Sequence, residues 1–169
     1  MKIGLIADSH DHLEHLELAV QLFKARGVTT IWHAGDMTTP RMILAMRGFA
    51  LAAVFGNNDH DRADLLRACN QIGGIMDGEM LELDAPDGPG QVALYHGTDP
   101  AFLTSLIQGG SYRVVVSGHT HRPKNQMVGK TLVLNPGTAH GFRQHATVMI
   151  YDTVLHAAEL IDLSQNLTI

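Results

Sequence analysis

Polar residues of the kinds that bind metal ions follow apolar segments of this chain repeatedly and in a fixed order. The seven residues are, in chain order, Asp8, His10, Asp36, Asn57, His96, His119 and His121. Most of the preceding segments are short apolar runs typical of buried strands. Open α/β sheets bind ligands at the carboxyl ends of their strands. The order therefore predicts that these side chains converge at one end of a sheet, in sufficient number to hold two divalent metal ions.

The spacing within the pattern allows two neighbouring ligands to bind the same metal ion. Asp8 and His10 are two residues apart just past an apolar segment, and residues at that spacing in an extended chain point to the same side. His119 and His121 repeat this arrangement. The carboxylate of Asp36 has two oxygens and can bridge two ions. Two ions and a shared carboxylate are thus compatible with the residue types present.

Each motif alone also has a simpler interpretation. An Asp-x-His after a strand is more often a helix cap with a surface histidine, and His96 alone is more often a hydrogen-bonded core residue. Asn57 lies in Gly-Asn-Asn-Asp, which is typical of a turn. Together they favour a metal site, because charged groups and histidines at the ends of several buried strands are costly unless they are paired or metal-bound.

The order of segments predicts an α/β fold. In the first part, expected strands alternate with helices: Lys2–Ala7, His12–Arg26, Thr29–Ala34, a short helix from Thr39 and Pro40, Ala50–Phe55 and Asp61–Cys69. Later come a helix at Pro100–Gln108, a strand at Tyr112–Val116, and three strand pairs: Glu79–Leu83 with Gln91–Tyr95, Gln126–Val128 with Thr131–Leu134, and Ala146–Tyr151 with Val154–Leu160. We expect one domain over 1–169, with two sheets facing each other and helices outside.

Composition narrows the function classes. No run approaches the roughly 20 apolar residues of a membrane helix, so no membrane association is expected. Cys69 is the only cysteine, which fits the reducing cytoplasm, where we expect the protein to be. The net charge is −5 without a basic cluster, which argues against a nucleic-acid partner. A small phosphorylated substrate is compatible with that charge, because bound metal ions reverse the local field.

The complete motif order resembles a known family. Asp-x-His, Gly-Asp, Gly-Asn-x-Asp, His-Gly and Gly-His-x-His occur in this order in the calcineurin-like metallophosphoesterases, and the resemblance covers nearly the whole chain. The Gly-Asn-Asn-Asp form and Asn135-Pro136-Gly137-Thr138 are similar to the small bacterial and archaeal phosphodiesterase branch. The resemblance implies a two-layer β-sandwich of mixed sheets flanked by helices. It also implies a dinuclear centre, with Asp8, His10 and His121 on one metal, Asn57, His96 and His119 on the other, and Asp36 bridging.

The resemblance further implies a phosphodiesterase that acts on small phosphodiester substrates through a hydroxide held between two divalent metals. Manganese is the first expectation for the metals, and iron, nickel, cobalt or zinc are alternatives, since mixed nitrogen and oxygen ligands suit all of them. Exposed strand edges and the Asp84–Gly90 loop leave a homo-oligomer possible. Two other functions are compatible with the pattern: a non-catalytic scaffold like the retromer subunit of this fold, and a nuclease. Retention of all seven ligands disfavours the scaffold, and the acidic, short chain disfavours the nuclease.

One position departs from the family pattern. Many members have a histidine where this chain has Asn58. An amide can hydrogen-bond a phosphoryl oxygen but cannot act as a general acid. We therefore expect diesters with an acidic leaving alcohol, or with a leaving oxygen that a metal stabilises, to be the better substrates. Asn58 and Asp59 are the catalytic candidates, with Asp59 expected to orient the Asn58 amide or a nearby histidine.

Three further residues are weaker candidates near the site. His140 is the best of the remaining histidines for a role in the pocket, because it follows Asn135-Pro136-Gly137. Asn135 is expected to support the ligands from behind. Arg143 is a candidate for binding the substrate phosphate, with a surface salt bridge as the default.

Overall fold

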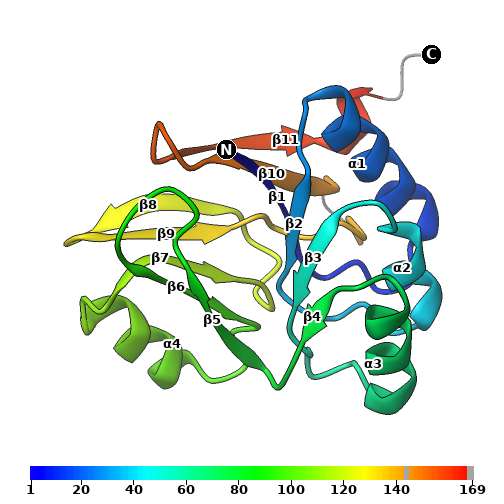
Figure 1. The fold of residues 1–169 in the computed structure, drawn as a ribbon, viewed down its shortest axis with the longest axis horizontal. Helices are drawn as coiled ribbons and strands as arrows, with labels where there is room; N and C mark the ends of the chain where they lie inside the picture. Colours follow the sequence, from blue (N-terminus) through cyan, green and yellow to red (C-terminus); the bar gives the residue numbers. More distant parts are fainter. Residues whose placement is uncertain (143–144, 167–169) are drawn as a thin grey trace.

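The apolar segments form two β-sheets that pack face to face with helices on their outer sides (Figure 1). This computed structural model describes residues 1–142 and 145–166. The strand orders are β11-β10-β1-β2-β3-β4 in the first sheet and β5-β6-β7-β9-β8 in the second. The predicted fold class, two mixed sheets flanked by helices, is confirmed.

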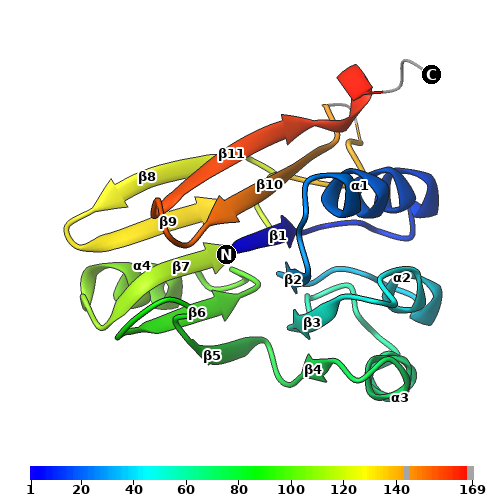
Figure 2. The same ribbon diagram turned by 45° about the horizontal axis from the view of Figure 1, so that its top comes forward.

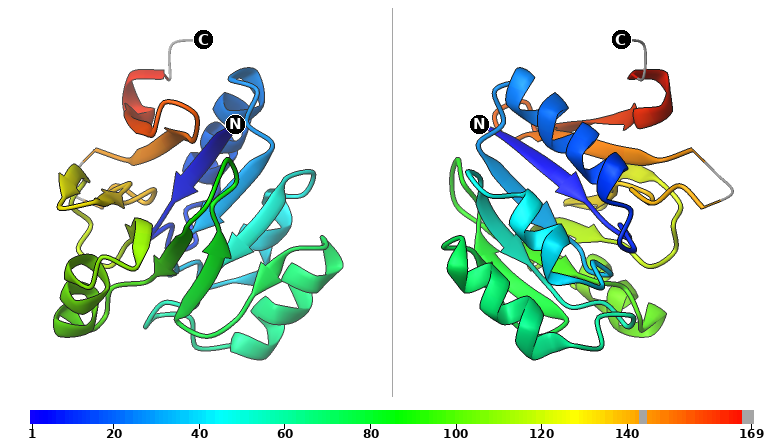
Figure 3. Two further views of the ribbon diagram at one scale, coloured as in Figure 1. Left: turned by 60° about the vertical axis from the view of Figure 1, so that its left-hand side comes forward. Right: turned by 90° about the vertical axis from the view of Figure 1, so that its right-hand side faces the viewer.

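The first sheet contains the alternating part of the chain. Its strands are β1 (Lys2–Ile6), β2 (Thr30–His33), β3 (Ala50–Ala53), β4 (Ile75–Met76), β10 (Thr147–Asp152) and β11 (Ala157–Asp162). The first four are parallel, and β10 and β11 continue the sheet in antiparallel fashion. Helices α1 (Leu13–Ala25), α2 (Pro40–Ala45) and α3 (Arg62–Gln71) follow β1, β2 and β3. All three cover the outer face of this sheet, as the right-hand view of Figure 3 shows.

The second sheet contains the later hairpins. Its strands are β5 (Met80–Asp84), β6 (Gln91–Tyr95), β7 (Tyr112–Ser117), β8 (Lys124–Val128) and β9 (Thr131–Asn135). Strands β6, β7 and β9 are parallel, and α4 (Pro100–Gln108) lies on the outer side. The short 3-10 helix η1 (Leu163–Asn166) follows β11. Within the described residues, no helix is both long enough and apolar enough to cross a membrane.

Apart from shifts of one or two residues at strand ends, two details of the strands differ from the sequence expectation. Strand β4 was not predicted, because two residues are too few to show a periodic pattern. The final hairpin was predicted to turn at Asp152-Thr153, with Val154 already in a strand, and this was wrong. The Asp152 Oδ1 atom accepts the backbone N–H groups of Val154 and Leu155, so the turn is longer and β11 begins at Ala157.

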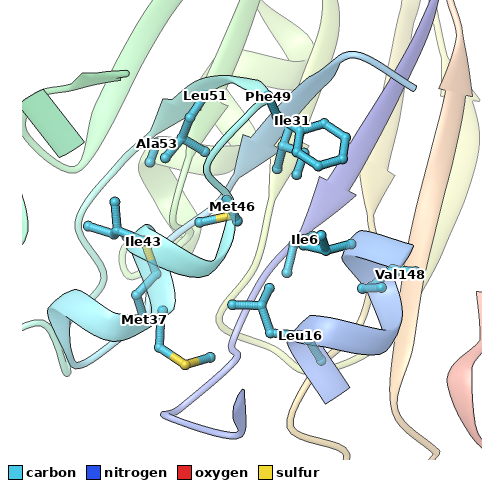
Figure 4. Close-up of a cluster of buried hydrophobic side chains, with 14 of the residues drawn as sticks. Ile6, Leu16, Ile31, Met37, Ile43, Met46, Phe49, Leu51, Ala53 and Val148 are labelled. Carbon is cyan, nitrogen blue, oxygen red and sulfur yellow. The ribbon is translucent and has the colours of Figure 1, made fainter. Parts of the chain in front are cut away.

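Two apolar layers hold the strand ends in place. Ile6, Ile31 and Val148 of the first sheet pack against Leu16 of α1 in the outer layer (Figure 4). A second layer lies between the two sheets and includes Leu5, Trp32, Leu94 and Val116. Each fully buried side chain of this size contributes about 1.5–3 kcal/mol. The two layers therefore stabilise the strands whose ends carry the predicted ligands.

Candidate metal centre

The loops that follow β1, β2, β3, β6 and β7 carry the seven predicted ligands, and the fold brings them together. Backbone hydrogen bonds join the loops directly. Asp8 N donates to Gly35 O (3.0 Å), His10 N donates to Asp36 O (2.9 Å), and Gly118 N donates to His96 O (2.9 Å). These bonds set the distances between loops that are far apart in the sequence.

Asp8, His10 and His121 form the first compact group of possible ligands. One nitrogen or oxygen atom from each lies within 4.8 Å of the others. His121 Nε2 lies 3.2 Å from Asp8 Oδ1, and His10 Nε2 lies 3.9 Å from the same oxygen. Asp8 is fully buried, and its carboxylate also accepts the backbone N–H of His119 at 2.9 Å. This group has the composition that the resemblance implies for one metal.

Asp36 lies between this group and the second one. Its Oδ2 atom is 3.4 Å from His10 Nε2, and its Oδ1 atom is 3.6 Å from His96 Nε2. Asp8, Asp36 and His96 also form a compact group of possible ligands. The carboxylate is almost fully buried. Its two oxygens thus face histidines of two different groups, which is the placement that a bridging ligand needs.

The histidine nitrogens are oriented in a way that fits a cation. His96 Nδ1 lies 2.7 Å from Ala34 O, and its Nε2 lies 3.0 Å from Asn57 Oδ1. A carbonyl oxygen can only accept, so Nδ1 carries the hydrogen in the neutral ring and the Nε2 lone pair faces oxygen atoms. His10 Nε2 is buried and has no hydrogen-bond partner in the described part of the chain. A divalent cation would satisfy these nitrogen and oxygen lone pairs together. His119 belongs to neither compact group of possible ligands, and its ring centroid lies 5.2 Å from that of His96.

Asn58 contacts the central carboxylate directly. Its backbone N–H donates to Asp36 Oδ1 (2.9 Å) and its side-chain Nδ2 donates to Asp36 Oδ2 (2.8 Å). Burial alone raises the pKa of Asp36, but these two bonds and the nearby histidines outweigh it, so the pKa lies below its ordinary value. Asp36 is therefore held as a carboxylate.

Asp59 has a different role from the one expected. It was predicted to orient the Asn58 amide or a histidine, but its oxygens accept three backbone N–H groups instead. These belong to Asp36 (2.9 Å), Thr38 (2.7 Å) and Gly56 (2.7 Å). Burial raises the pKa of Asp59 even though the bonds from Gly56 and Thr38 lower it. Asp59 joins the loop after β2 to the loop after β3.

The backbone at the site is left-handed at most of the predicted ligands. Positive φ angles occur at Asp8 (52°), His10 (40°), Asp36 (59°), His119 (65°) and His121 (56°). Asp and His tolerate this region better than most residues, yet each such position costs on the order of 1–3 kcal/mol. Five of the seven predicted ligands carry this cost, and nothing in the spacing of the sequence indicates it.

The pKa values of the histidines shift in different directions across the site. Burial lowers the pKa of His10, and the hydrogen bond with Asp8 raises the pKa of His121. His33 lies behind the ligands and is fully buried, which lowers its pKa to about 3. Its Nδ1 accepts the Gly35 N–H (3.2 Å), and its Nε2 lies 3.2 Å from Ser9 Oγ. His33 is therefore a neutral support for two ligand loops.

The residues around the ligands include some that the sequence indicated and one that it did not. Asn135 Nδ2 donates to Gly118 O (2.9 Å), so it supports the loop that carries His119. The His140 ring lies 6.2 Å from that of His10. Phe142 was not singled out from the sequence, yet its ring centroid is 4.9 Å from that of His10. Arg143 lies outside the described residues.

Comparisons with known proteins show the family of this chain. The family model for the calcineurin-like phosphoesterase superfamily domain matches residues 1–155. The chain is 33% identical over 159 residues to phosphodiesterase MJ0936 of Methanocaldococcus jannaschii, which covers 90% of this chain and 93% of that protein.

Solved structures of known proteins share the fold of this chain. The structure of a novel archaeal phosphodiesterase matches with a TM-score of 0.88 and 30% identity, over 96% of this chain and 99% of that one. Vps29 of Chaetomium thermophilum matches with a TM-score of 0.67 over 89% of this chain and 81% of that one, and at 16% identity this likeness shows the fold alone. From its motif order, its fold and the family match over residues 1–155, this chain belongs to the calcineurin-like phosphoesterase superfamily.

Proposed function

We propose that this protein is a metal-dependent phosphodiesterase that hydrolyses small phosphodiesters at a dinuclear centre. The observation that carries the proposal is the position of Asp36, whose two oxygens face His10 on one side and His96 on the other. Asp8, His10 and His121 would hold the first ion, Asn57, His96 and His119 the second, and Asp36 both. The named phosphodiesterase relative supports the choice of reaction.

Two divalent ions held there would supply an attacking water of lowered pKa and neutralise charge on the phosphoryl oxygens. Manganese is our first choice for the metal, because carboxylate and amide oxygens suit it alongside the imidazoles. Cys69 as the only cysteine fits a cytoplasmic location, which we include in the proposal.

Asn58 has a second hydrogen available for substrate. A side-chain amide nitrogen carries two hydrogens, and one of those on Nδ2 is bound to Asp36 Oδ2. The other can donate to a phosphoryl oxygen lying over the Asp36 carboxylate. Asn58 thus orients Asp36 and binds substrate, while Asp59 is a positioning residue that acts through the backbone. Because neither amide hydrogen is acidic, substrates with good leaving groups fit this site best.

A groove beside His121 gives the organic part of a diester a place to bind. The groove has a volume of about 640 Å³, and its lining includes His121, Pro123, His145 and Leu160. Its lining residues come from the segment between β7 and β8, from β10 and β11, and from the segments that precede β10 and follow β11. Strands β8 and β11 are neighbours in Figure 2, and Asn125 Nδ2 of β8 donates to Ala158 O of β11 (2.7 Å). Leu160 is 45% exposed and offers an apolar contact. One ester arm can lie in this groove while the phosphate is at the metals.

The test is metal content together with hydrolysis of bis(p-nitrophenyl) phosphate by the purified protein loaded with Mn²⁺. Two ions per chain and turnover of the diester are expected. Asp36→Asn should abolish turnover and weaken binding of both ions, because it removes the shared charge. Asp77→Asn, at an exposed aspartate, is the matched control and should behave as wild type.

Each alternative function has its own outcome in this experiment. A scaffold would bind metal weakly or not at all and leave the diester intact. A nuclease would cleave oligonucleotides with far higher kcat/KM than the small diester. Near-normal turnover by Asp36→Asn would contradict the bridging role itself.

A further inference from the structure

Phe142 lies against the predicted first metal group, although no motif includes it. Its ring is stacked parallel to that of His121, with centroids 5.0 Å apart and 10° between the planes. It meets the His10 ring edge-on at 4.9 Å and stacks on the His140 ring at 3.9 Å. Phe142 is nevertheless 52% exposed, so burial alone does not explain its place.

The two sides of the centre hold their histidines in different ways. His96 is fixed by the short contact between Nδ1 and Ala34 O (2.7 Å), the usual arrangement for a metal-binding histidine. The buried Nε2 atom of His10 has no hydrogen-bond partner in the part of the chain that the structure describes, although it lies 3.4 Å from Asp36 Oδ2. The plane of its ring is instead set by neighbouring rings, of which Phe142 is the nearest.

The backbone holds Phe142 in this position despite an unfavourable conformation. Its φ angle is 41°, which is rare for a bulky residue and costs on the order of 1–3 kcal/mol. The Phe142 N–H donates to His140 Nδ1 (2.9 Å), and the His140 N–H donates to Asp8 O (3.1 Å). The segment is thus joined to the strand end that carries Asp8. Strain kept at an exposed aromatic residue beside ligands points to a functional reason.

We propose that Phe142 is a positioning residue for the first metal ion, because it fixes the ring planes of His10 and His121. The inference builds on the dinuclear centre proposed above. Binding of the ion at Asp8, His10 and His121 then depends on Phe142. Binding of the ion at Asn57, His96 and His119 does not, since no ring contact joins Phe142 to those residues among the described ones.

Calorimetric titration of the metal-free protein with Mn²⁺ tests this directly. Wild type is expected to take up two ions. Phe142→Ala should weaken one of them by about 10- to 100-fold, the usual effect of losing the support of a ligand, and leave the other unchanged. Phe142→Tyr keeps the ring, so it should bind both ions with wild-type affinity. Phe102→Ala is the matched control, because Phe102 is 42% exposed and its ring contacts Tyr95 rather than the site.

Each outcome has a distinct meaning. Two ions bound by Phe142→Ala as tightly as by wild type would overturn the inference, as would equal weakening of both. Phe142→Leu, which keeps apolar bulk without a ring, takes the place of Phe142→Ala if that variant does not fold. Absence of metal binding by wild type would overturn the metal centre itself, separately from any role of Phe142.

Discussion

Both oxygens of the Asp36 carboxylate accept hydrogen bonds from Asn58, one from its backbone N–H (2.9 Å) and one from its side-chain Nδ2 (2.8 Å). One residue therefore fixes the rotation of the carboxylate that lies between His10 and His96. The identity of residue 58 is coupled in this way to the geometry of the centre as well as to the substrate.

The choice of leaving group should change in Asn58→His. An imidazole can protonate the leaving oxygen near neutral pH, which the amide cannot, and general acids contribute about 10²–10⁴-fold to such steps. We expect the ratio of kcat/KM for an alkyl phosphate to that for p-nitrophenyl phosphate to rise at least about 10-fold. Asn70→His, on the exposed surface of α3, is the control. The same ratio in both variants would contradict our account of position 58.

Gly56→Ala should disrupt the centre without adding any polar group. A Cβ atom at Gly56 would lie 2.0 Å from Asp36 Oδ1 and 2.4 Å from Asp36 N, so the bridging carboxylate would have to move. Displacements of about 1 Å at an active site cost about 100-fold in rate. We expect that loss in kcat/KM for bis(p-nitrophenyl) phosphate, with weaker metal binding.

Gly27→Ala is the control for the Gly56 substitution. Gly27 has a positive φ of 72° and open space around it. Its replacement should lower the free energy of unfolding by about 1 kcal/mol through backbone strain while activity is retained. A fully active Gly56→Ala protein would show that the loop adapts and that the close approach is dispensable.

The free energy of unfolding should decrease as the pH is lowered, because His33 is buried in its neutral form. Its folded pKa of about 3 lies below the unfolded value of 6.5, so the unfolded chain binds the extra proton between these values. The stabilisation is complete above pH 6.5 and is lost at about 1.4 kcal/mol per pH unit as the pH falls towards 3.

Urea unfolding of the metal-free protein at pH 7 and pH 5 measures this contribution. His33→Gln, which has no titrating group, should lose about 2 kcal/mol less than wild type between the two pH values. His60→Gln, at an exposed histidine, should match wild type. Equal losses in all three proteins would mean that His33 is not the group responsible.

The groove beside His121 should discriminate between diesters by size. Leu160→Trp fills part of the groove, so the KM for bis(p-nitrophenyl) phosphate should rise about 10-fold, the effect of roughly 1.4 kcal/mol of lost binding. Methyl p-nitrophenyl phosphate, with one small arm, should be affected much less. Leu155→Trp, in the exposed turn of the last hairpin, is the control. Equal effects on the two diesters would exclude the groove as the binding place of the second arm.

The α/β class, the two sheets and the order of the candidate ligands follow from local patterns in the sequence. Short apolar runs form strands, and the residue that follows a strand lies at its end whatever the rest of the chain does. Pro100–Gln108 was predicted with the bounds that the structure has, and in the structure Asp99 caps this helix and Pro100 begins it. Strand β4 and the turn after Asp152 escaped prediction because two residues give no period and a side-chain cap moved the turn.

The sequence by itself determined which chemical groups stand at the strand ends. The tertiary structure alone decided which of them face one another. Asp36 between His10 and His96, Asp59 bound to backbone amides rather than to Asn58, and Phe142 stacked on His121 all join segments from different loops. Such contacts depend on the packing of two sheets and on left-handed backbone at the ligands, and neither leaves a periodic trace in the chain.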